Sequence, residues 1–216
     1  MLAAIDGAGG VGKSTLAVCI ADLLDEPHVV CLNELARRPR WHKYAGRVEA
    51  TIRAYEQRDA GDLAEVFFRS VRQVAISDYT PAQVRAWAPE RRTAEWSHQW
   101  ASDGRLVLLA TNENDRAIAF IDLEPDGHID HLFCAPEAAG QGIASQLYEA
   151  TETAARQQEI SRLYTEASEL ARRFFDRKGF VVLKRQDMVL RGEPIHNYKM
   201  AKDLTAPVSG STGSTP

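Results

Sequence analysis

The stretch from His128 to Gln158 constrains the fold more than any other part of the chain. It reads HIDHLFCAPEAAGQGIASQLYEATETAARQQ. An apolar strand, Ile129 to Cys134, is followed by Ala135-Pro136, which ends it because proline has no N–H to donate to a sheet. A loop of small residues, 138–142, then leads into a helix. Apolar residues recur in this helix at helical spacing and predict one buried face: Ile143, Leu147, Ala150, Ala154 and Ala155.

A strand, a glycine loop and a helix N-terminus in this order are typical of an anion-binding site. The free N–H groups of the first helical turn point outward, and the helix dipole favours negative charge there. Gly140 and Gly142 allow a bulky anion to approach the backbone closely. The residues alone therefore predict a site for a phosphate or pyrophosphate group.

The same stretch resembles the acetyl-CoA signature of the GNAT acetyltransferases. The similarity runs from Cys134-Ala-Pro to Gly140-Gln141-Gly142-Ile143-Ala144 and on to Leu147. The family's pattern is Gln/Arg-x-x-Gly-x-Gly/Ala, which this chain fits at Gly142 and Ala144. It departs from the pattern at Ala139, where Gln or Arg is usual. Downstream, SELARRFFDRKGF (168–180) resembles the family's late helix and the strand after it.

The resemblance extends over residues 50–204, about the size of an ordinary domain. It implies an α/β (α+β) fold in which a mixed, mostly antiparallel central sheet is flanked by helices. We accordingly divide the chain into three parts. Residues 1–47 form a truncated P-loop unit and basic linker, residues 48–204 form a GNAT N-acetyltransferase domain, and residues 205–216 form a Ser-, Gly- and Thr-rich tail that we expect to be disordered.

The N-terminal part carries a second phosphate-binding motif. Gly7 to Ser14 fits Gly-x4-Gly-Lys-Ser/Thr and lies between an apolar strand, 2–5, and a helix, 13–24, with a second strand at 29–32. This opening resembles the P-loop kinases, uridine-kinase-like ones in particular. The resemblance implies that Lys13 reaches the phosphates of ATP or GTP and that Ser14 holds magnesium.

The rest of a kinase is missing from the sequence. Residues 37–47 turn basic, and the only later apolar strand that ends in an acid, Ala117 to Asp122, runs into Glu-Pro-Asp-Gly and a further strand. That order indicates a β-hairpin, whereas a kinase sheet would continue into a helix. ATP or GTP binding at Gly7–Ser14 is therefore the minor alternative.

Alternation and capping residues predict the other elements of the GNAT-like domain. Strands are expected at 50–55, 106–110, 117–123, 163–167, 180–185 and 195–200, and a helix at 59–74. Thr80, Pro81 and Gln83 form a capping box that starts another helix. Ser168 caps the late helix and Gly179 closes it.

The resemblance implies acetyl-CoA as cosubstrate and names its contacts. The pantetheine arm is expected along the backbone of Leu132, Phe133 and Cys134, where that strand splays from the strand at 163–167. The pyrophosphate is expected on amides of the loop and first turn: Gly140, Gln141, Gly142, Ile143, Ala144 and Ser145. Ser168 and Phe175 of the late helix complete the predicted cofactor site.

Acetyl transfer to an amine needs a base for the ammonium proton, and an acid can reprotonate the thiolate. Family members use a tyrosine four residues before the Gly-Phe pair, and this chain has Phe175 there. Substitutes are Tyr164, Tyr148, Tyr198 or solvent. The base candidates are Asp130, His131 and Glu166. Because Asp130 and His131 are adjacent on a strand, we expect them on opposite faces, with only one facing the acceptor.

Other reactive side chains are assigned structural roles. His128 and His131 are three apart, which places them on opposite strand faces, so no metal is assigned. Cys134 lacks a fixed base partner and is interpreted as a small core residue. Trp87, Trp96 and Trp100 fall in the region that borders the acceptor pocket in GNAT-like folds, and core packing is expected for at least two of them.

Composition excludes some partners. With 44% hydrophobic residues and a net charge of −4, the 216-residue chain can form a packed core and has no general drive towards nucleic acid or anionic membrane. The odd count of Cys19, Cys31 and Cys134, without a secretion signal, favours a reduced, cytoplasmic protein. The oligomeric state is left open, with a homodimer as one alternative.

The function predicted from these observations is N-acetyl transfer from acetyl-CoA to a primary amine, directly in a ternary complex. A small-molecule amine and a peptide lysine are both open as acceptors. The carboxylates of Asp122, Glu124, Asp126, Asp130 and Glu166 favour a cationic acceptor. Two other classes stay open: a P-loop kinase, and a non-catalytic acetyl-CoA sensor that the departure at Phe175 would fit.

Overall fold

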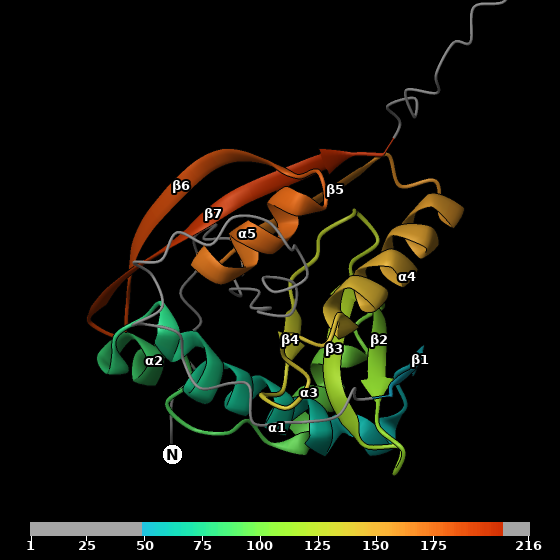
Figure 1. Cartoon of the computed structure of the whole chain (residues 1–216), viewed down its shortest axis with the longest axis horizontal. Helices are drawn as coiled ribbons and strands as arrows, with labels where there is room; N and C mark the ends of the chain where they lie inside the picture. The colour runs from blue at the N-terminus through green and yellow to red at the C-terminus, as the bar shows by residue number, and fades with distance from the viewer. Residues whose placement is uncertain (1–48, 205–216) are drawn as a thin grey trace, which may run out of the picture.

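The computed structural model describes residues 49–204, and Figure 1 shows how their elements are arranged. The predicted P-loop unit and linker, 1–47, and the tail, 205–216, lie outside the described residues. The first sheet contains β1 (Thr51–Ala54), β2 (Leu106–Thr111), β3 (Ala117–Leu123) and β4 (Leu132–Cys134), in that order and all antiparallel. Antiparallel sheets flanked by helices agree with the predicted α/β class, but the strands form two sheets linked by one parallel bridge, His128 to Tyr164, and not one mixed central sheet.

A second sheet follows in the C-terminal part of the domain. It consists of β5 (Arg162–Ala167), β7 (Glu193–Asp203) and β6 (Val181–Leu190), again antiparallel, with β7 in the centre. Figure 1 shows β6 and β7 as long curved strands that diverge from β2 to β4. Both strands are longer than the sequence predicted. β6 is an edge strand whose first five residues are all exposed and do not alternate between core and solvent.

Helices cover both faces of the first sheet. On one face lies α4 (Ile143–Gln157), which packs on β2, β3 and β4. On the other lie α1 (Ala60–Arg69) and α3 (Ala94–Ala101), joined through 3-10 and π turns and the short helix α2 (Pro81–Trp87). The predicted helix at 59–74 is therefore real but ends in a π turn, 70–74. The helix α5 (Glu169–Arg177) packs on β5 and β7 of the second sheet.

The two faces form two hydrophobic clusters. Ile121, Leu147 and Phe174 belong to the cluster beneath α4 and α5, and Phe67, Trp87 and Phe133 belong to the cluster beneath α1, α2 and α3. The short strand β4 is common to both, because Leu132 and Phe133 are fully buried on opposite sides of it. The strand therefore links the two halves of the core.

Predicted turns and caps are confirmed. Thr80 and Gln83 form the capping box of α2, and the Ser168 hydroxyl accepts a hydrogen bond from the Ala171 N–H at the start of α5. The turn after β3 closes with a hydrogen bond from Glu124 N–H to His128 O at 2.8 Å. Gly127 is required there: its φ is +93°, and a Cβ would lie 2.1 Å from the Arg162 carbonyl oxygen.

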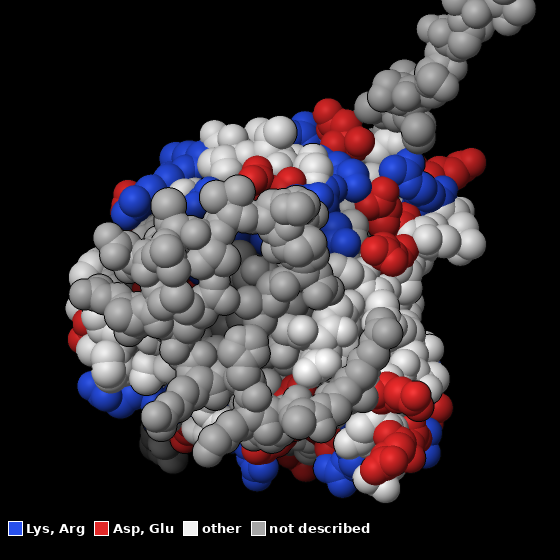
Figure 2. All heavy atoms as spheres, viewed as in Figure 1, with Lys and Arg blue, Asp and Glu red and all other residues white. Residues whose placement is uncertain are grey.

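Charges of both signs are interspersed on the surface. Figure 2 shows Lys and Arg side chains along the rim over β6 and β7, with Asp and Glu among them. On β6, for example, Arg185 pairs with Asp187 at 2.9 Å. Within residues 49–204, none of the helices is long and apolar enough to cross a membrane.

Candidate active site

The two sheets meet at one point and then separate. Ile129 N–H donates to Tyr164 O at 2.9 Å, and Tyr164 N–H donates to Gly127 O at 3.0 Å. Past this bridge, β4 belongs only to the first sheet and forms its edge, while β5 belongs to the second. An edge strand beside a separating strand offers backbone N–H and C=O groups to an extended ligand. This is the splay that the sequence predicted beside Leu132, Phe133 and Cys134.

The loop before α4 has the geometry of an anion site. Gly140 and Gly142 have φ values of 74° and 75°, and Gly142 is the N-cap of α4 without a side-chain cap. A Cβ at Gly142 would meet nothing within 4 Å, so the space in front of the loop is open. The first turn contains no acidic residue, and Ile143 and Ala144 anchor it in the core. Gln141 and Ser145 are half-buried on the same turn.

An ion pair that the sequence did not predict attaches this loop to α1. Arg69 donates to both carboxylate oxygens of Glu137, at 2.8 and 2.6 Å. Burial alone would raise the pKa of Glu137, but Arg69 holds it below the usual range. The bidentate pair ties the beginning of the loop to the helix that lines the other side of β4.

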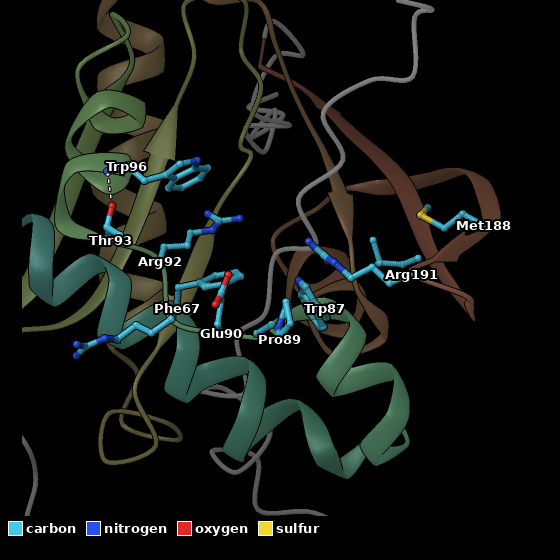
Figure 3. Close-up of a pocket in the computed structure, with 12 residues that line it drawn as sticks. Phe67, Trp87, Pro89, Glu90, Arg92, Thr93, Trp96, Met188 and Arg191 are labelled. Atoms are coloured by element: carbon cyan, nitrogen blue, oxygen red, sulfur yellow. Dashed lines mark hydrogen bonds between the residues drawn. The ribbon is translucent and has the colours of Figure 1, made fainter. Parts of the chain in front are cut away.

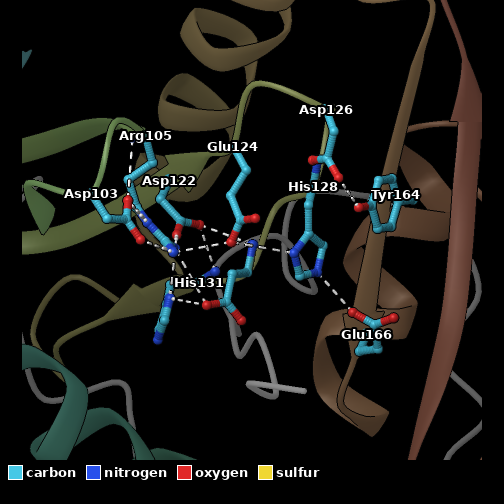
Figure 4. A network of polar contacts seen from close by, with 10 residues as sticks. Asp103, Arg105, Asp122, Glu124, Asp126, His128, His131, Tyr164 and Glu166 are labelled. Carbon is cyan, nitrogen blue, oxygen red and sulfur yellow. Dashed lines mark hydrogen bonds and ion pairs between the residues drawn. The ribbon is translucent and has the colours of Figure 1, made fainter. Parts of the chain in front are cut away.

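Arg105 forms ion pairs with most of the acidic residues around β4. The guanidinium of Arg105, which is 3% exposed, contacts Asp122 and lies 3.3 Å from Asp130, 2.8 Å from Asp103 and 3.0 Å from Glu124. Figure 4 shows this network. Burial alone would lower the pKa of Arg105, but the carboxylates of Asp103 and Asp122 raise it overall. The carboxylates near β4 are therefore neutralised inside the protein by Arg105, the residue directly before β2.

This network also answers the question of a metal. Ligand atoms of Asp122, Asp130 and His131 lie within 4.8 Å of one another, all buried. The Arg105 guanidinium, however, already lies against both carboxylates as their counter-charge. We assign no metal to this cluster, as we assigned none from the sequence.

Asp130 and His131 point into the same network, so the prediction of opposite strand faces is wrong. The regular strand begins only at Leu132, and both backbone N–H groups of Asp130 and His131 donate to Asp122 Oδ1, at 3.0 and 2.7 Å. This turns both side chains inward. His131 Nδ1 lies 3.2 Å from Asp130 Oδ2 and 3.3 Å from Asp122 Oδ2.

The other ring nitrogen of His131 is the chemically notable atom. Nε2 is buried and has no hydrogen-bond partner among the described residues. The ring packs 4.3 Å from Trp100 and 5.6 Å from Phe133, centroid to centroid. Burial alone would lower the pKa of His131, but Asp130 and Asp122 raise it above the ordinary 6.5. A histidine oriented by carboxylates at Nδ1 is a typical proton acceptor at Nε2.

Glu166 and Tyr164 lie at the bridge between the sheets. Glu166 pairs with His128 Nε2 at 2.8 Å, and the Tyr164 hydroxyl donates to Asp126 at 2.5 Å, while its ring stacks on His128 (Figure 4). Burial and then Asp126 raise the pKa of Tyr164. Burial alone would lower the pKa of His128, but Glu166 raises it. Because Tyr164 is held by a carboxylate, it is a weaker acid than a free phenol.

The remaining acid candidates donate hydrogen bonds to carboxylates. Tyr148 is 2% exposed and donates to Glu152 at 2.6 Å, and Tyr198 donates to Glu169 at 2.8 Å. Phe175 is fully buried against the rings of Tyr148, Phe174 and Phe180. Both Phe175 and the helix cap Ser168 therefore serve α5 packing in this structure, which favours a structural role over the predicted cofactor contact.

A cavity of about 510 Å³ lies beside β4, between α1, the connection from α2 to α3, and the turn between β6 and β7 (Figure 3). Phe67 and Trp87 form part of its wall, and their rings lie 5.0 and 6.5 Å from that of Phe133 in β4. Trp96 also lines the cavity, whereas Trp100 packs against His131. Two of the three tryptophans thus border the cavity.

Comparison with known proteins agrees with this geometry. The acetyltransferase (GNAT) domain model matches residues 75–202. The uncharacterized N-acetyltransferase YafP of Escherichia coli (strain K12) is 32% identical over 149 residues, which span 69% of this chain and 93% of YafP. The chain belongs to the GNAT acetyltransferase family and is therefore an acyltransferase enzyme.

Solved structures share the fold. A GCN5-related N-acetyltransferase from Rhodopseudomonas palustris is 29% identical, with a TM-score of 0.63 over 73% of this chain and 98% of its own. The putative acetyltransferase yncA from Salmonella typhimurium, solved with acetyl-CoA, is 15% identical with a TM-score of 0.60 and covers 76% of this chain and 99% of its own. The PaiA N-acetyltransferase from Thermoplasma acidophilum, solved with coenzyme A, is 19% identical with a TM-score of 0.58, covering 72% and 99%.

Proposed function

We propose that this chain transfers the acetyl group of acetyl-CoA directly to an amine. The observation that carries the proposal is the uncapped N-terminus of α4 behind two left-handed glycines, next to the edge strand β4. Such a loop fits a pyrophosphate, and such an edge fits an extended pantetheine arm. Two relatives of the same fold were solved with acetyl-CoA or coenzyme A.

Acetyl-CoA supplies an activated thioester. The residues of this chain position the two substrates and deprotonate the amine. Backbone N–H groups of β4 that are not used in pairing with β3 would stabilise the oxyanion that develops on the thioester carbonyl. The amine nitrogen attacks the carbonyl carbon, the C–N bond forms, the C–S bond breaks, and the thiolate leaves. The ammonium proton must first be removed by a base, because a protonated amine has no lone pair.

Among the predicted base candidates we assign this role to His131. Its Nε2 has no partner among the described residues, and its ring packs against Phe133 of β4. Asp122 and Asp130 hold Nδ1 and position the ring. Glu166 is the second candidate, acting with His128, although it lies at the bridge between the sheets. With Tyr148, Tyr164 and Tyr198 all donating to carboxylates, solvent is the proposed proton source for the thiolate.

The charge of the acceptor needs to be reconsidered. The cationic acceptor predicted from the sequence depended on carboxylates without counter-charges. In the structure Arg105 pairs with Asp122, Asp130 and Glu124, and Glu166 pairs with His128. Those charges no longer support a preference for a cation, and the residues of the cavity become the better guide.

The test is release of the coenzyme A thiol from acetyl-CoA by the full chain with a panel of amines, with the acetylated amine identified by mass spectrometry. Acetyl transfer to at least one amine is expected. Calorimetric binding of acetyl-CoA without turnover on any amine would favour the sensor instead. Absence of acetyl-CoA binding would exclude both.

A further inference from the structure

The cavity lies near β4, along which we propose that acetyl-CoA binds, and its charged residues are unusual. Its volume of about 510 Å³ lies within the range of small-molecule sites. Its wall shares Phe67 and Trp87 with the aromatic cluster around Phe133. The question is which chemical group this cavity is built to hold.

Arg92 is the most informative residue of the cavity. Its guanidinium carbon lies 4.2 Å from the centre of the Phe67 ring and 3.8 Å from that of Trp96. The side chain is half-buried, and no carboxylate within residues 49–204 forms an ion pair with it. Arg53, Arg69 and Arg105, by contrast, each pair with a carboxylate. Arg92 is thus a partly desolvated cation held in place by aromatic faces.

Nearby negative charge compensates the Arg92 cation only in part. Burial lowers the pKa of Arg92 to about 10; Asp130 opposes this decrease and Arg191 adds to it. Figure 3 shows Arg92 and Arg191 extending towards one another from opposite sides of the cavity. Arg191 donates to the Ala86 carbonyl oxygen at 2.7 Å, which fixes its position.

The other charged residues of the lining do not restore the balance. Arg91 is occupied by Glu65, at 3.0 Å. Glu90 is the acidic residue of the lining, and it forms no ion pair with Arg92 or Arg191 among the described residues. Among the described residues of the lining, the positive charges of Arg92 and Arg191 therefore exceed the single negative charge of Glu90.

We propose that the acceptor amine also carries an anionic group, a carboxylate or a phosphate, which Arg92 binds in this cavity with Arg191 at its other side. A guanidinium presents a planar fork of donors that matches these oxyanions, and partial desolvation strengthens the contact. The amine of such an acceptor then points towards β4, next to the aromatic wall. The inference rests on the proposed acetyl transfer and names the acceptor class for the same site.

The experiment compares matched acceptors. Amino acids, the same compounds as carboxamides, and their phosphonate analogues are assayed for kcat/KM by thiol release with the full chain. The anionic members should exceed the carboxamide by at least about tenfold, since an ionic partner of a buried guanidinium is lost in the amide. Whether the carboxylate or the phosphonate is better identifies the anion.

Variants then test whether Arg92 is responsible. Arg92→Gln should lower kcat/KM for the anionic acceptor by at least about tenfold, mainly through KM, and leave the carboxamide nearly unchanged. Arg92→Lys keeps the charge without the fork and should fall in between. Arg58→Gln is the control, because this arginine is not part of the cavity lining, is exposed and is already paired with Glu56, and it should change little. Thermal unfolding of each variant checks that the fold persists.

Two outcomes would overturn the inference while leaving acetyl transfer intact. One is a best acceptor that is neutral or cationic. The other is a loss in Arg92→Gln that is equal for the anionic acceptor and its carboxamide, which a purely structural role of the stacked guanidinium would produce. Failure of every amine to release thiol would instead contradict the proposed function.

Discussion

Gly142 is the residue on which the proposed cofactor site depends most directly. Its φ of 75° and the open space at its Cβ mean that valine there would project into the expected pyrophosphate position. We expect Gly142→Val to abolish acetyl-CoA binding in calorimetry at a cost to stability of about 1–3 kcal/mol from backbone strain. Gly192→Val is the matched control, with a φ of 85° and equal space in the turn between β6 and β7. An unchanged affinity of Gly142→Val for acetyl-CoA would show that this loop does not bind the pyrophosphate.

The proposed base gives a dependence of activity on pH. Because the pKa of His131 is raised above 6.5, its imidazole is charged at low pH and becomes a base only as pH rises through that pKa. We expect kcat/KM to increase with pH accordingly, and Asp130→Asn to move the increase to lower pH, since a carboxylate that stabilises the imidazolium is removed. His131→Gln should reduce kcat/KM by about 10²–10⁴-fold.

His128→Gln is the control for that series, because it removes a second buried histidine with a raised pKa that is bound to Glu166 instead. It should leave the midpoint of the pH profile in place. If the midpoint of the pH profile shifts in His128 or Glu166 variants but not in Asp130→Asn, Glu166 and not His131 would be the base.

At the scale of single residues, the sequence predicted correctly those contacts that join residues close together in the chain. The hydroxyl cap of Ser168 and the capping box of Thr80 need only residues three positions away, and both are present. The orientation of Asp130 depended on Arg105, which is 25 residues earlier in the chain, so strand alternation predicted it wrongly. The position of Arg92 depended on rings from two other helices. Our proposal that Arg92 binds an anionic group therefore rests on its stacking against these rings in space, which the sequence did not predict.

Among the elements, α4 and β7 are joined by a partly buried polar contact that gives a stability prediction. Glu152 accepts hydrogen bonds from Lys202 and Tyr148, each at 2.6 Å, and from Arg156 at 2.7 Å. Burial alone would raise the pKa of Glu152, but these partners lower it to about 2. A depressed carboxyl pKa contributes stability above its ordinary value of 4.5, and this stability is lost as pH falls towards 2.

We therefore expect Glu152→Gln to lower the free energy of unfolding by about 1 kcal/mol at pH 7, after allowance for partial exposure. The difference from the unsubstituted protein should shrink when urea unfolding is repeated at pH 3. Glu149→Gln on the same helix is the control, because Glu149 is 69% exposed and its pairing with Lys178 is weak. An equal loss for Glu152→Gln at both pH values would contradict the ionic account.

The sheets illustrate the same contrast between local and distant causes. The order of β2, β3 and β4 follows from consecutive hairpins, and the Gly127 turn was visible in Pro-Asp-Gly, whereas β1 pairs with β2 across the intervening helices. The length of β6 was not visible, because Val181, Val182 and Leu183 are exposed on an edge strand and carry no alternation. The point where the sheets separate depends on the contact between His128 and Tyr164, which no periodicity encodes.

At the scale of the whole molecule, residues 49–204 contain both sheets, both hydrophobic clusters and the cavity. The family match, 75–202, lies within the same range. The elements that the proposed reaction requires are thus found without the P-loop motif Gly7–Ser14, which lies outside the described residues. The division of the chain into a GNAT domain and an N-terminal P-loop unit stays a prediction.

We expect deletion of residues 1–47 to leave acetyl transfer largely intact, and Lys13→Ala in the full chain to change nothing in turnover. The reason is that a truncated P-loop unit lacks the further strands and the acidic residue that phosphoryl transfer needs. Turnover on the best amine and the melting temperature are measured for the full chain, the deletion and the point variant. If either change removed acetyltransferase activity while the melting temperature held, the N-terminal unit would be an integral part of the active enzyme.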